Sequence, residues 1–356
     1  MLSYHPLRLR RVVHDPAGAT RLWFDVPAEL ADAFRYRPGQ YVGLRATIAG
    51  RDTRRTYSIC GAPEAGAIEL CVKRVPGGEM SQHLAATVRE GDVMDVLTPQ
   101  GRFSANVDPA QTKTYVFFAA GSGITPVISN LRAILAAEPG SRAILCYGNR
   151  TAAEVLFNEE LQALKDRHMT RLALHFFFSR EPQHVALYDG RLDASKVQAL
   201  LASVIPASEV DEFYVCGPLA MNEEIVAALR AAGVHGDRVK IERFGVPRPG
   251  TKPAAPAAPV EDTGPIEVEL TQDGRVRRFH MHEHETLLEA AERHHFALPF
   301  SCRAGVCATC RCRATKGSVA MHTNYALERW ELDAGFILTC QAKPKTPQLA
   351  ITYDEK

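Results

Sequence analysis

The chain has 356 residues, which is enough for two or three domains that each bury a core of their own. Hydrophobic residues make up 46% and charged residues 23%, and the formal net charge of +1 gives no electrostatic basis for binding nucleic acid or an anionic membrane. No apolar run reaches the roughly 20 residues that span a bilayer. The segment MLSYHPLRLRRVV has no apolar h-region and no small-residue cleavage site, so we do not expect secretion. Nine cysteines favour metal or redox chemistry over disulfides, so we expect a cytoplasmic protein.

The first segment, residues 1–108, has the pattern of short strands separated by turns. Apolar residues alternate at Leu22, Phe24 and Val26, and turn signals such as Pro38-Gly39 and Pro99-Gln100-Gly101 divide the runs. Closely spaced strands of this kind predict a small antiparallel β-barrel domain.

In residues 109–245, apolar strands alternate with helical patterns. Strands are expected at TYVFFAA, RAILCYGNR, RLALHFFFSR, EFYVCGP and RVKIERF, and helices from about Pro126 and over 153–166, 193–201 and 219–232. Because parallel strands need crossover helices, this alternation predicts an α/β domain built on a parallel sheet.

A Pro/Ala-rich stretch follows at 246–264, and its lack of large apolar residues predicts an extended linker. The last unit, residues 265–356, opens with two strands joined at Gln272-Asp273-Gly274, which is a hairpin signal. A short helix is expected from Thr286 to His294. We therefore predict three domains and one linker.

Four cysteines of the last unit form the most specific motif in the chain. Cys302, Cys307 and Cys310 have the spacing C-x4-C-x2-C, and Cys340 completes the set. Plant-type [2Fe–2S] clusters are held by four thiolates at this spacing, in loops whose small residues let backbone N–H groups point at the sulfurs. A four-cysteine zinc site is the alternative, although such sites usually pair two C-x2-C knuckles. We interpret Cys312 as a buried apolar side chain.

The run Arg55-Thr56-Tyr57-Ser58 ends a predicted strand, and its side chains suit a flavin nucleotide. Arginine pairs with pyrophosphate, tyrosine stacks on the ring, and a serine hydroxyl can reach flavin N5. Further along, a strand ends at Gly77-Gly78 and Ser81 is expected to open a helix whose free N–H groups suit a phosphate. The alternative is a plain barrel with chance turns.

The segment Gly121 to Pro126, GSGITP, departs from G-x-G-x-x-G because proline replaces the last glycine. Thr125 is expected to cap the following helix and Pro126 to occupy its first position, and the glycines allow a pyrophosphate to approach the backbone. Taken alone, the segment could be an ordinary strand–helix turn.

Three further segments end predicted strands of the same sheet: 147–150, Ser179-Arg180 and 216–218. Ligands of open parallel sheets bind at that edge. Arginine suits phosphate bidentately, so Arg150, Ser179 and Arg180 are predicted to receive the 2′-phosphate of NADPH. A charged surface is the alternative for either arginine.

Together, these motifs resemble those of the ferredoxin–NADP⁺ reductase superfamily, in its oxygenase-reductase branch with a C-terminal plant-type ferredoxin domain. RTYS, GGEMS, GSGITP, CGP and the four cysteines carry the resemblance over essentially the whole chain. A narrower resemblance, in YGNRT at 147–151 and in the run from CATCRCRATKG to LTCQAKP, is to the reductase subunits of phenylacetyl-CoA ring-1,2-epoxidases. Such subunits are NADPH-dependent, bind FAD and pass electrons to a di-iron oxygenase.

The resemblance implies an α+β (β-grasp) ferredoxin domain whose metal ligands are the four cysteines, and it implies roles for single residues. The residues implied for FAD are Arg55, Thr56, Tyr57, Ser58, Val72, Lys73, Gly78, Met80 and Ser81, with Phe244 covering part of the flavin. The residues implied for NADPH are Gly121, Ser122, Gly123, Thr125, Arg150, Ser179, Arg180, Cys216, Gly217, Pro218 and Met221. Tyr57, Ser58 and Cys216, the last beside the nicotinamide, are the implied catalytic residues.

The number of electrons that each cofactor exchanges sets the order in which the cofactors act. NADPH gives up two electrons as a hydride and a [2Fe–2S] cluster accepts one, so a flavin must stand between them. The sequence therefore predicts a reductase that passes electrons from NADPH to FAD, to the cluster and then to an oxygenase component, with the phenylacetyl-CoA epoxidase subunits as the expected partner. Alternatives are the reductase of another oxygenase or of a hybrid-cluster protein, and a flavin/iron–sulfur redox sensor.

Overall fold

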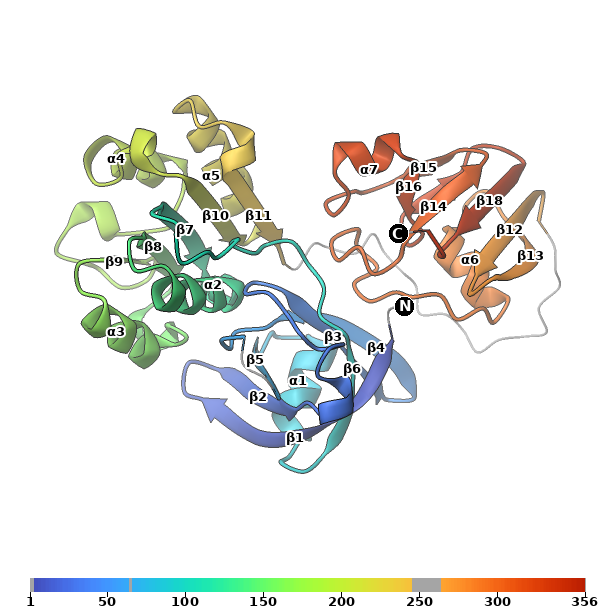
Figure 1. The fold of residues 1–356 in the computed structure, drawn as a ribbon, viewed down its shortest axis with the longest axis horizontal. Helices are drawn as coiled ribbons and strands as arrows, with labels where there is room; N and C mark the ends of the chain where they lie inside the picture. Colours follow the sequence, from blue (N-terminus) through green and yellow to red (C-terminus); the bar gives the residue numbers. More distant parts are fainter. Residues whose placement is uncertain (1–2, 64–65, 245–263, 356) are drawn as a thin grey trace. The chain divides into compact units, whose positions relative to one another are not determined.

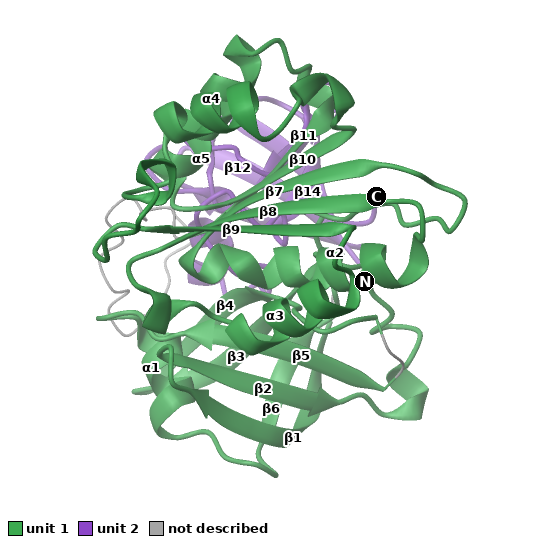
Figure 2. Ribbon diagram, turned by 90° about the vertical axis from the view of Figure 1, so that its left-hand side faces the viewer, with its two compact units in different colours: residues 1, 3–245 green, residues 2, 246–356 purple. Residues whose placement is uncertain are grey.

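The computed structural model of this chain describes residues 3–63, 66–244 and 264–355 (Figure 1). The chain divides between residues 245 and 246 into two compact units (Figure 2). Apart from Gly264, the predicted linker at 246–264 lies outside the described residues. Within the described ranges, no helix is both long enough and apolar enough to cross a bilayer.

The first part of unit 1 is a six-stranded barrel. Its strands are β1 (Tyr4–Asp15), β2 (Ala19–Asp25), β3 (Tyr41–Ile48), β4 (Arg51–Ser58), β5 (Ala67–Lys73) and β6 (Val93–Leu97). Every pairing is antiparallel in the order β4-β3-β6-β1-β2-β5, and a bridge between Ile59 and Leu70 joins the two ends of the sheet. Helix α1 (Glu79–Ala86) buries Met80 and Leu84 in the barrel core. The predicted antiparallel barrel is confirmed.

The second part of unit 1 is a parallel sheet in the order β11-β10-β7-β8-β9. Its strands are β7 (Thr114–Ala120), β8 (Arg142–Asn149), β9 (Leu172–Phe178), β10 (Glu212–Gly217) and β11 (Val239–Arg243). The crossover helices are α2 (Ile124–Ala137), α3 (Asn158–Arg167), α4 (Ala194–Ser203) and α5 (Leu219–Ala231). The predicted α/β domain is therefore confirmed, although α3 begins five residues later than the pattern indicated.

The helices cover both faces of this sheet, and Figure 2 shows α2 and α3 on the side of the barrel, with α4 and α5 on the other. Apolar residues of α2 and α3 share one core with alternate residues of β7, including Tyr115 and Phe117. The intervening residues Val116 and Phe118 pack with α4 and α5 in a second core. Because both faces are covered, the strands read as continuous apolar runs.

Short 3₁₀ turns complete unit 1. They are η1 (Ala28–Leu30), η2 (Gly121–Gly123), η3 (Ala152–Glu154), η4 (Ala186–Tyr188), η5 (Ala207–Glu209) and η6 (Gly236–Arg238). The turn η2 lies between β7 and α2, so that the N-cap of α2 is Gly123. The expectation that Thr125 caps this helix was wrong, because Thr125 lies within the first turn, where its hydroxyl donates to the carbonyl of Ser122 at 3.0 Å. Pro126, expected at the first helical position, is the third residue of α2, because the helix begins at Ile124.

Unit 2 is a mixed sheet with a helix packed on it, in the order β13-β12-β18-β14-β16. Its elements are β12 (Ile266–Gln272), β13 (Arg275–Met281), α6 (Leu287–Arg293), β14 (Arg311–Lys316), β15 (Val319–Met321), α7 (Arg329–Asp333), β16 (Phe336–Leu338), β17 (Ala342–Pro344) and β18 (Gln348–Thr352). Only the β12–β18 pairing in this sheet is parallel, and β15 and β17 form a separate two-stranded ribbon. This is the expected β-grasp arrangement.

Local signals set the start of unit 2. The hairpin turns at Asp273-Gly274, where both residues have positive φ, and Thr286 caps α6 in a capping box with Glu289. Leu287 and Leu288 begin the face of α6 that is buried against the sheet. The predicted hairpin and short helix are both confirmed.

Candidate functional site

The end of β4 brings together the residues predicted to hold the flavin ring. In the β3–β4 ladder, Ser58 lies opposite Tyr41, and Ser58 is 4% exposed. Burial raises the pKa of the Tyr57 phenol, and the nearby Arg55 guanidinium opposes that rise. Arg55 donates to the carbonyl of Arg54 at 2.7 Å, and no carboxylate in the described part of the chain pairs with it. A neutral aromatic ring beside an available cation fits a flavin nucleotide.

The loop before α1 presents free backbone N–H groups. Helix α1 begins at Glu79, so the expectation that Ser81 opens it was wrong by two residues, and Gly78 is the N-cap without a side-chain cap. The Ser81 hydroxyl is used inside the loop, where it donates to the Gly78 carbonyl at 3.0 Å and accepts from Val75 N–H at 3.2 Å. A Cβ on Gly78 would lie 2.6 Å from that hydroxyl. The first backbone N–H groups of α1 remain available for a phosphate.

Two of the residues predicted for the flavin site have their side chains in the barrel core. Val72 is 2% exposed and Met80 is 1% exposed, so only their backbone groups can face a ligand. Lys73, in contrast, is half-buried, and its ammonium pairs with Glu154 of η3 at 3.3 Å. The Lys73–Glu154 pair joins the barrel to the α/β domain.

The carboxyl edge of the parallel sheet forms a narrow turn at GSGITP. Gly121 has φ of +52°, and its carbonyl accepts a 2.8 Å hydrogen bond from the Tyr147 hydroxyl at the end of β8. A Cβ on Gly123 would lie 2.0 Å from the carbonyl oxygen of Cys216, and one on Gly217 would lie 2.4 Å from Cε of Met221. These glycines are needed for close packing of the turn against the end of β10. The edge left open is the place where a dinucleotide binds in such sheets.

The loops after β8 and β9 lie side by side. Ser179 N–H donates to the carbonyl of Asn149 at 3.0 Å, and Arg180 N–H donates to that of Arg150 at 2.8 Å. The carboxylate of Glu181 accepts from Ala152 N–H at 2.8 Å, which ties the two loops further. The three residues predicted for the 2′-phosphate, Arg150, Ser179 and Arg180, are all exposed on these adjacent loops.

Cys216 lies at the end of β10, completely buried, and burial raises the pKa of its thiol well above the usual value. Its Cα partner on β11 is Glu242, and burial raises the pKa of the Glu242 carboxyl to about 8. The next residue but one is Phe244, whose ring packs against the α/β core. A carboxyl with a raised pKa, a buried thiol and an aromatic ring therefore lie at the end of two neighbouring strands.

Sequence reasoning missed Glu242 at this edge, and it included Asn149 in a predicted segment without giving it a role. Glu242 was read only as part of a strand, because its raised pKa depends on the β10–β11 register and on burial, which a single sequence does not show. Asn149 buries its side-chain amide without a hydrogen-bond partner in the described residues, at the carboxyl end of β8. A buried amide of this kind is costly unless a ligand or water completes it. Its position in the YGNR segment was the available signal.

Helix α2 joins this edge directly to the segment that follows β4. Ser129 donates to the Gly61 carbonyl at 2.8 Å, and the Arg132 guanidinium donates to the Cys60 carbonyl at 2.9 Å. Asn130, which is fully buried, donates to the Phe103 carbonyl at 2.9 Å. Three bonds from one helix thus hold the barrel, two of them at the segment that follows Ser58.

A group of charged side chains reinforces the same junction. Glu69 on β5 pairs with Arg21 on β2 at 2.5 Å and with Arg132 on α2 at 3.3 Å. Arg21 also pairs with Glu160 on α3, and the ring of Phe157 lies near both guanidiniums, 4.8 Å from Arg21 and 5.8 Å from Arg132. Because these charges are largely withdrawn from water, each depends on its partners.

The four cysteines of unit 2 form two pairs. Cys302 interacts with Cys307, and Cys310 interacts with Cys340, through thiol–thiol hydrogen bonds. The bond from Cys307 lowers the pKa of the Cys302 thiol to about 6, and the bond from Cys310 lowers that of Cys340. No three His, Cys, Asp or Glu side chains in the described ranges form a site for one metal ion. Two thiol pairs fit a cluster with two irons.

The loop around the cysteines fits a negatively charged cluster. The N–H groups of Cys302 and Ala304 donate to the sulfurs of Cys307 and Cys302, both at 3.4 Å. The hydroxyl of Ser301 is buried without a hydrogen-bond partner in the part of the chain described, which a cluster sulfur could supply. The predicted orientation of N–H groups toward the sulfurs is confirmed.

The backbone conformation of the cysteine loop depends on small residues, and Cys312, which follows the loop, belongs to the core of unit 2. Arg303, Gly305 and Ala308 have positive φ, and a Cβ on Gly305 would lie 2.7 Å from the carbonyl oxygen of Thr323. Cys312 lies on β14 with no exposed surface, in the core of unit 2, as expected. Glycine is therefore required at 305 for the loop to close.

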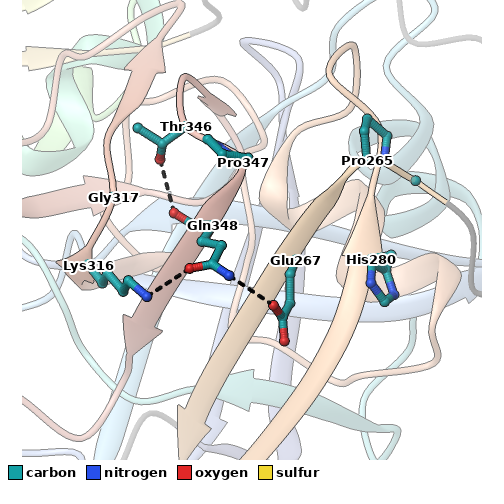
Figure 3. Close-up of a pocket in the computed structure, with 9 residues that line it drawn as sticks. Pro265, Glu267, His280, Lys316, Gly317, Thr346, Pro347 and Gln348 are labelled. Atoms are coloured by element: carbon teal, nitrogen blue, oxygen red, sulfur yellow. Dashed lines mark hydrogen bonds between the residues drawn. The ribbon is translucent and has the colours of Figure 1, made fainter.

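A surface pocket in unit 2 lies beside Gly264, where the described chain resumes (Figure 3). Gln348 spans its floor, accepting from the Lys316 ammonium at 2.8 Å and donating to Glu267 at 3.4 Å. Its lining contains none of the residues predicted for a cofactor. The pocket is thus no candidate for the redox site.

Comparison with known proteins agrees with this three-part layout. Residues 11–105 match the family model of the oxidoreductase FAD-binding domain, 117–227 that of the oxidoreductase NAD-binding domain, and 270–345 that of the 2Fe-2S iron-sulfur cluster binding domain. Over 357 aligned positions, the chain is 39% identical to a subunit of the 1,2-phenylacetyl-CoA epoxidase of Escherichia coli (strain K12), covering 100% of this chain and 99% of that one. The chain belongs to the ferredoxin–NADP⁺ reductase superfamily, in its oxygenase-reductase branch.

Other relatives of this reductase have the same layout. It is 33% identical to the ferredoxin reductase component of 3-ketosteroid-9-alpha-monooxygenase from Rhodococcus rhodochrous, over 98% of this chain and 96% of that one. Its fold is similar to that of phthalate dioxygenase reductase, with a TM-score of 0.58 at 21% identity, covering 98% of both chains. The reductase is an NAD(P)H-dependent oxidoreductase with FAD, NAD(P) and 2Fe-2S domains. It transfers electrons to an oxygenase in the manner of a ferredoxin reductase.

Proposed function

We propose that this reductase takes electrons from NADPH and delivers them, through FAD and a [2Fe–2S] cluster, to the di-iron oxygenase subunits of a phenylacetyl-CoA epoxidase. The observation that carries the partner assignment is the 39% identity to the Escherichia coli epoxidase subunit along the full length of both chains. The proposed domains are 1–108 for FAD, 109–245 for NADPH and 265–356 for the cluster, with 246–264 as the linker.

In this proposal, the barrel binds and orients the flavin. Bound FAD supplies the step from a two-electron hydride donor to one-electron delivery. Arg55 and the N-terminus of α1 would neutralise its phosphates, and Tyr57 would contact its ring. Ser58, which would also face the ring, is positioned by the β3 ladder and by the bonds of α2 to residues 60 and 61. Water is excluded because Ser58 and the following residues are buried.

The parallel sheet binds the nucleotide in the same proposal. The glycines of 121–123 admit the pyrophosphate, and Arg150, Ser179 and Arg180 bind the 2′-phosphate with two guanidinium groups and a hydroxyl. Cys216, Gly217 and Pro218, at the end of β10, would lie beside the nicotinamide. The carboxyl of Glu242, protonated below about pH 8, keeps negative charge away from this end of the sheet.

The four cysteines Cys302, Cys307, Cys310 and Cys340 are proposed to hold the cluster, which would supply one-electron transfer there. This assignment is supported by the two thiol pairs and by the N–H groups aimed at the sulfurs. The cluster is then the exit for single electrons. The two units belong to one chain, so each is present at a high effective concentration near the other. Electrostatic attraction is therefore not needed to bring them together, which agrees with the net charge of +1.

Reconstitution tests the proposal. The purified reductase is mixed with the oxygenase subunits of a phenylacetyl-CoA epoxidase, phenylacetyl-CoA, NADPH and oxygen, and NADPH oxidation and epoxide are measured together. We expect one epoxide for each NADPH oxidised. NADPH oxidation without epoxide, in a mixture that the Escherichia coli relative makes active, would refute the partner while leaving the reductase chemistry intact.

The second candidate partner is a steroid oxygenase. It is supported by the 33% identity to a 3-ketosteroid-9-alpha-monooxygenase reductase component over 98% of the chain. The same assay with that oxygenase distinguishes the two, because the proposal predicts much slower coupled turnover there than with the epoxidase.

A further inference from the structure

Gln341, the residue after Cys340, is a buried polar side chain to which the cofactor assignments give no role. It is 4% exposed, although glutamine usually lies at the surface. Its amide nitrogen donates to the carbonyl oxygen of Arg303 at 3.0 Å and to the sulfur of Cys340 at 3.5 Å. One side-chain amide carries two N–H donors, so both contacts are made at once.

The position of Gln341 is fixed from several directions. Its own N–H donates to the Leu338 carbonyl at 2.9 Å, and its carbonyl accepts from His322 N–H at 3.1 Å. A Cβ on Gly305 would lie 3.2 Å from Cγ of Gln341, so the glutamine stem packs directly on that glycine. The amide is therefore held in place by contacts within the protein.

The bond to Arg303 also acts on a second cysteine. The Arg303 carbonyl and the Ala304 N–H belong to one planar peptide group and point in opposite directions. Ala304 N–H donates to the sulfur of Cys302 at 3.4 Å, and Arg303 has φ of +53°, an uncommon conformation for this residue type. By holding the carbonyl, Gln341 aims the N–H at Cys302. Gln341 thus donates directly to the sulfur of Cys340 and orients the N–H that donates to the sulfur of Cys302, which is one sulfur from each thiol pair.

We propose that Gln341 is a positioning residue that raises the reduction potential of the cluster by directing N–H donors at Cys340 and Cys302. This inference rests on the proposed assignment of the four cysteines as ligands. Reduction adds one electron, and so one negative charge, to the group that the cysteines hold, while no bond forms or breaks. Hydrogen bonds to the sulfurs favour the more negative state. Removing them makes reduction harder.

Two substitutions test the proposal in the full-length reductase. Gln341→Met keeps the length and bulk of the side chain and removes both donors, and Gln341→Glu keeps its shape but accepts hydrogen bonds where glutamine donates. Gln348→Met makes the same change at an exposed glutamine of unit 2 and is the matched control. The midpoint potential is measured by redox titration, following the electron paramagnetic resonance signal of the reduced cluster.

We expect the equilibrium constant for one-electron reduction to fall about tenfold in Gln341→Met, a shift of about −59 mV for a one-electron couple. Gln341→Glu should shift further in the same direction, because it adds a negative charge, while Gln348→Met should match the wild type. A wild-type potential in Gln341→Met, with iron and sulfide bound, would overturn the proposal.

Cluster-free protein provides a second test, which applies if neither variant takes up iron. Amide hydrogen exchange over residues 301–306 is compared between cluster-free wild type and Gln341→Met. Faster exchange at Ala304 in the variant is expected, and equal exchange would overturn the inference. A wild type that binds no iron or sulfide would instead refute the ligand assignment itself, so the two failures are distinguishable.

Discussion

Ser129 on α2 donates a 2.8 Å hydrogen bond to the carbonyl of Gly61, three residues beyond Ser58 at the end of β4. The N-cap of the same helix is Gly123, where a Cβ would lie 2.0 Å from the carbonyl oxygen of Cys216. One rigid helix therefore contacts both the strand proposed to hold the flavin and the strand end proposed to hold the nicotinamide. This sets how the two rings can meet.

The first prediction concerns Ser129→Ala. The change leaves the Gly61 carbonyl buried without its donor, at a cost of about 1–3 kcal/mol in the free energy of unfolding. If α2 positions the two rings, flavin reduction by NADPH slows at least roughly tenfold, while the dissociation constant for NADPH changes less than about twofold. Stopped-flow absorbance measures both quantities.

The control for this prediction is Ser203→Ala, which removes an exposed hydroxyl that bonds within α4. It should leave both the rate and the stability unchanged. An unchanged rate of flavin reduction in Ser129→Ala, despite the lower stability, would show that the bond is structural only.

The second prediction concerns nucleotide choice. Arg150→Ala or Arg180→Ala removes a charged donor from the proposed 2′-phosphate site, so the ratio of kcat/KM for NADPH over NADH should fall about tenfold in each, or ~1.4 kcal/mol. Arg329→Ala, an exposed arginine of unit 2, is the matched control. Steady-state kinetics with both nucleotides provide the measurement. Wild-type ratios in both variants would remove these arginines from the site.

The third prediction concerns pH. The Glu242 carboxyl has a pKa of about 8 in the folded protein against 4.5 for an ordinary glutamate, so the folded protein keeps a proton that the unfolded chain loses. The stability from this proton is fully present below about pH 4.5 and is lost as the pH rises to about 8. Glu242→Gln cannot ionise, so it should gain stability relative to the wild type across this window. Thermal midpoints from pH 5 to pH 9 test this, and a pH-independent difference would contradict it.

The fourth prediction separates the two ends of the electron path. Cys307→Ser removes one proposed iron ligand, so NADPH-driven reduction of cytochrome c should be lost while flavin reduction by NADPH keeps its wild-type rate. Cys312→Ser changes the same side chain at a buried position outside the ligand set and should keep the cluster. Full cytochrome c reduction in Cys307→Ser would mean that electrons leave without the cluster.

Much of this architecture could be predicted because its signals are local. The turn at Asp273-Gly274 and the cap at Thr286 need only neighbouring residues, and the spacing of Cys302, Cys307 and Cys310 reflects one loop. The starts of α1 and α2 were displaced by two residues, because glycine-rich turns before a helix offer more than one N-cap and packing decides between them.

Other features could not be predicted, since they depend on contacts between distant segments. The Ser129–Gly61 bond joins residues 68 positions apart, and the raised pKa of Glu242 depends on strand register and burial. The positive φ of Arg303 has no signal in its residue type, because the Gln341 amide and the loop around it hold that conformation. Such residues are found only when the fold is known.

The most direct test of the proposed electron path mixes the full-length reductase with one equivalent of NADPH in the absence of oxygen and follows the electrons over time. Flavin absorbance is recorded by stopped flow, and the electron paramagnetic resonance of samples frozen at matching times is recorded alongside it. We predict that flavin absorbance falls first, as the flavin is reduced. The signal of a reduced [2Fe–2S] cluster should then grow as the reduced flavin gives up an electron. A cluster signal that precedes flavin reduction, or a reduced flavin with no cluster signal, would contradict this path.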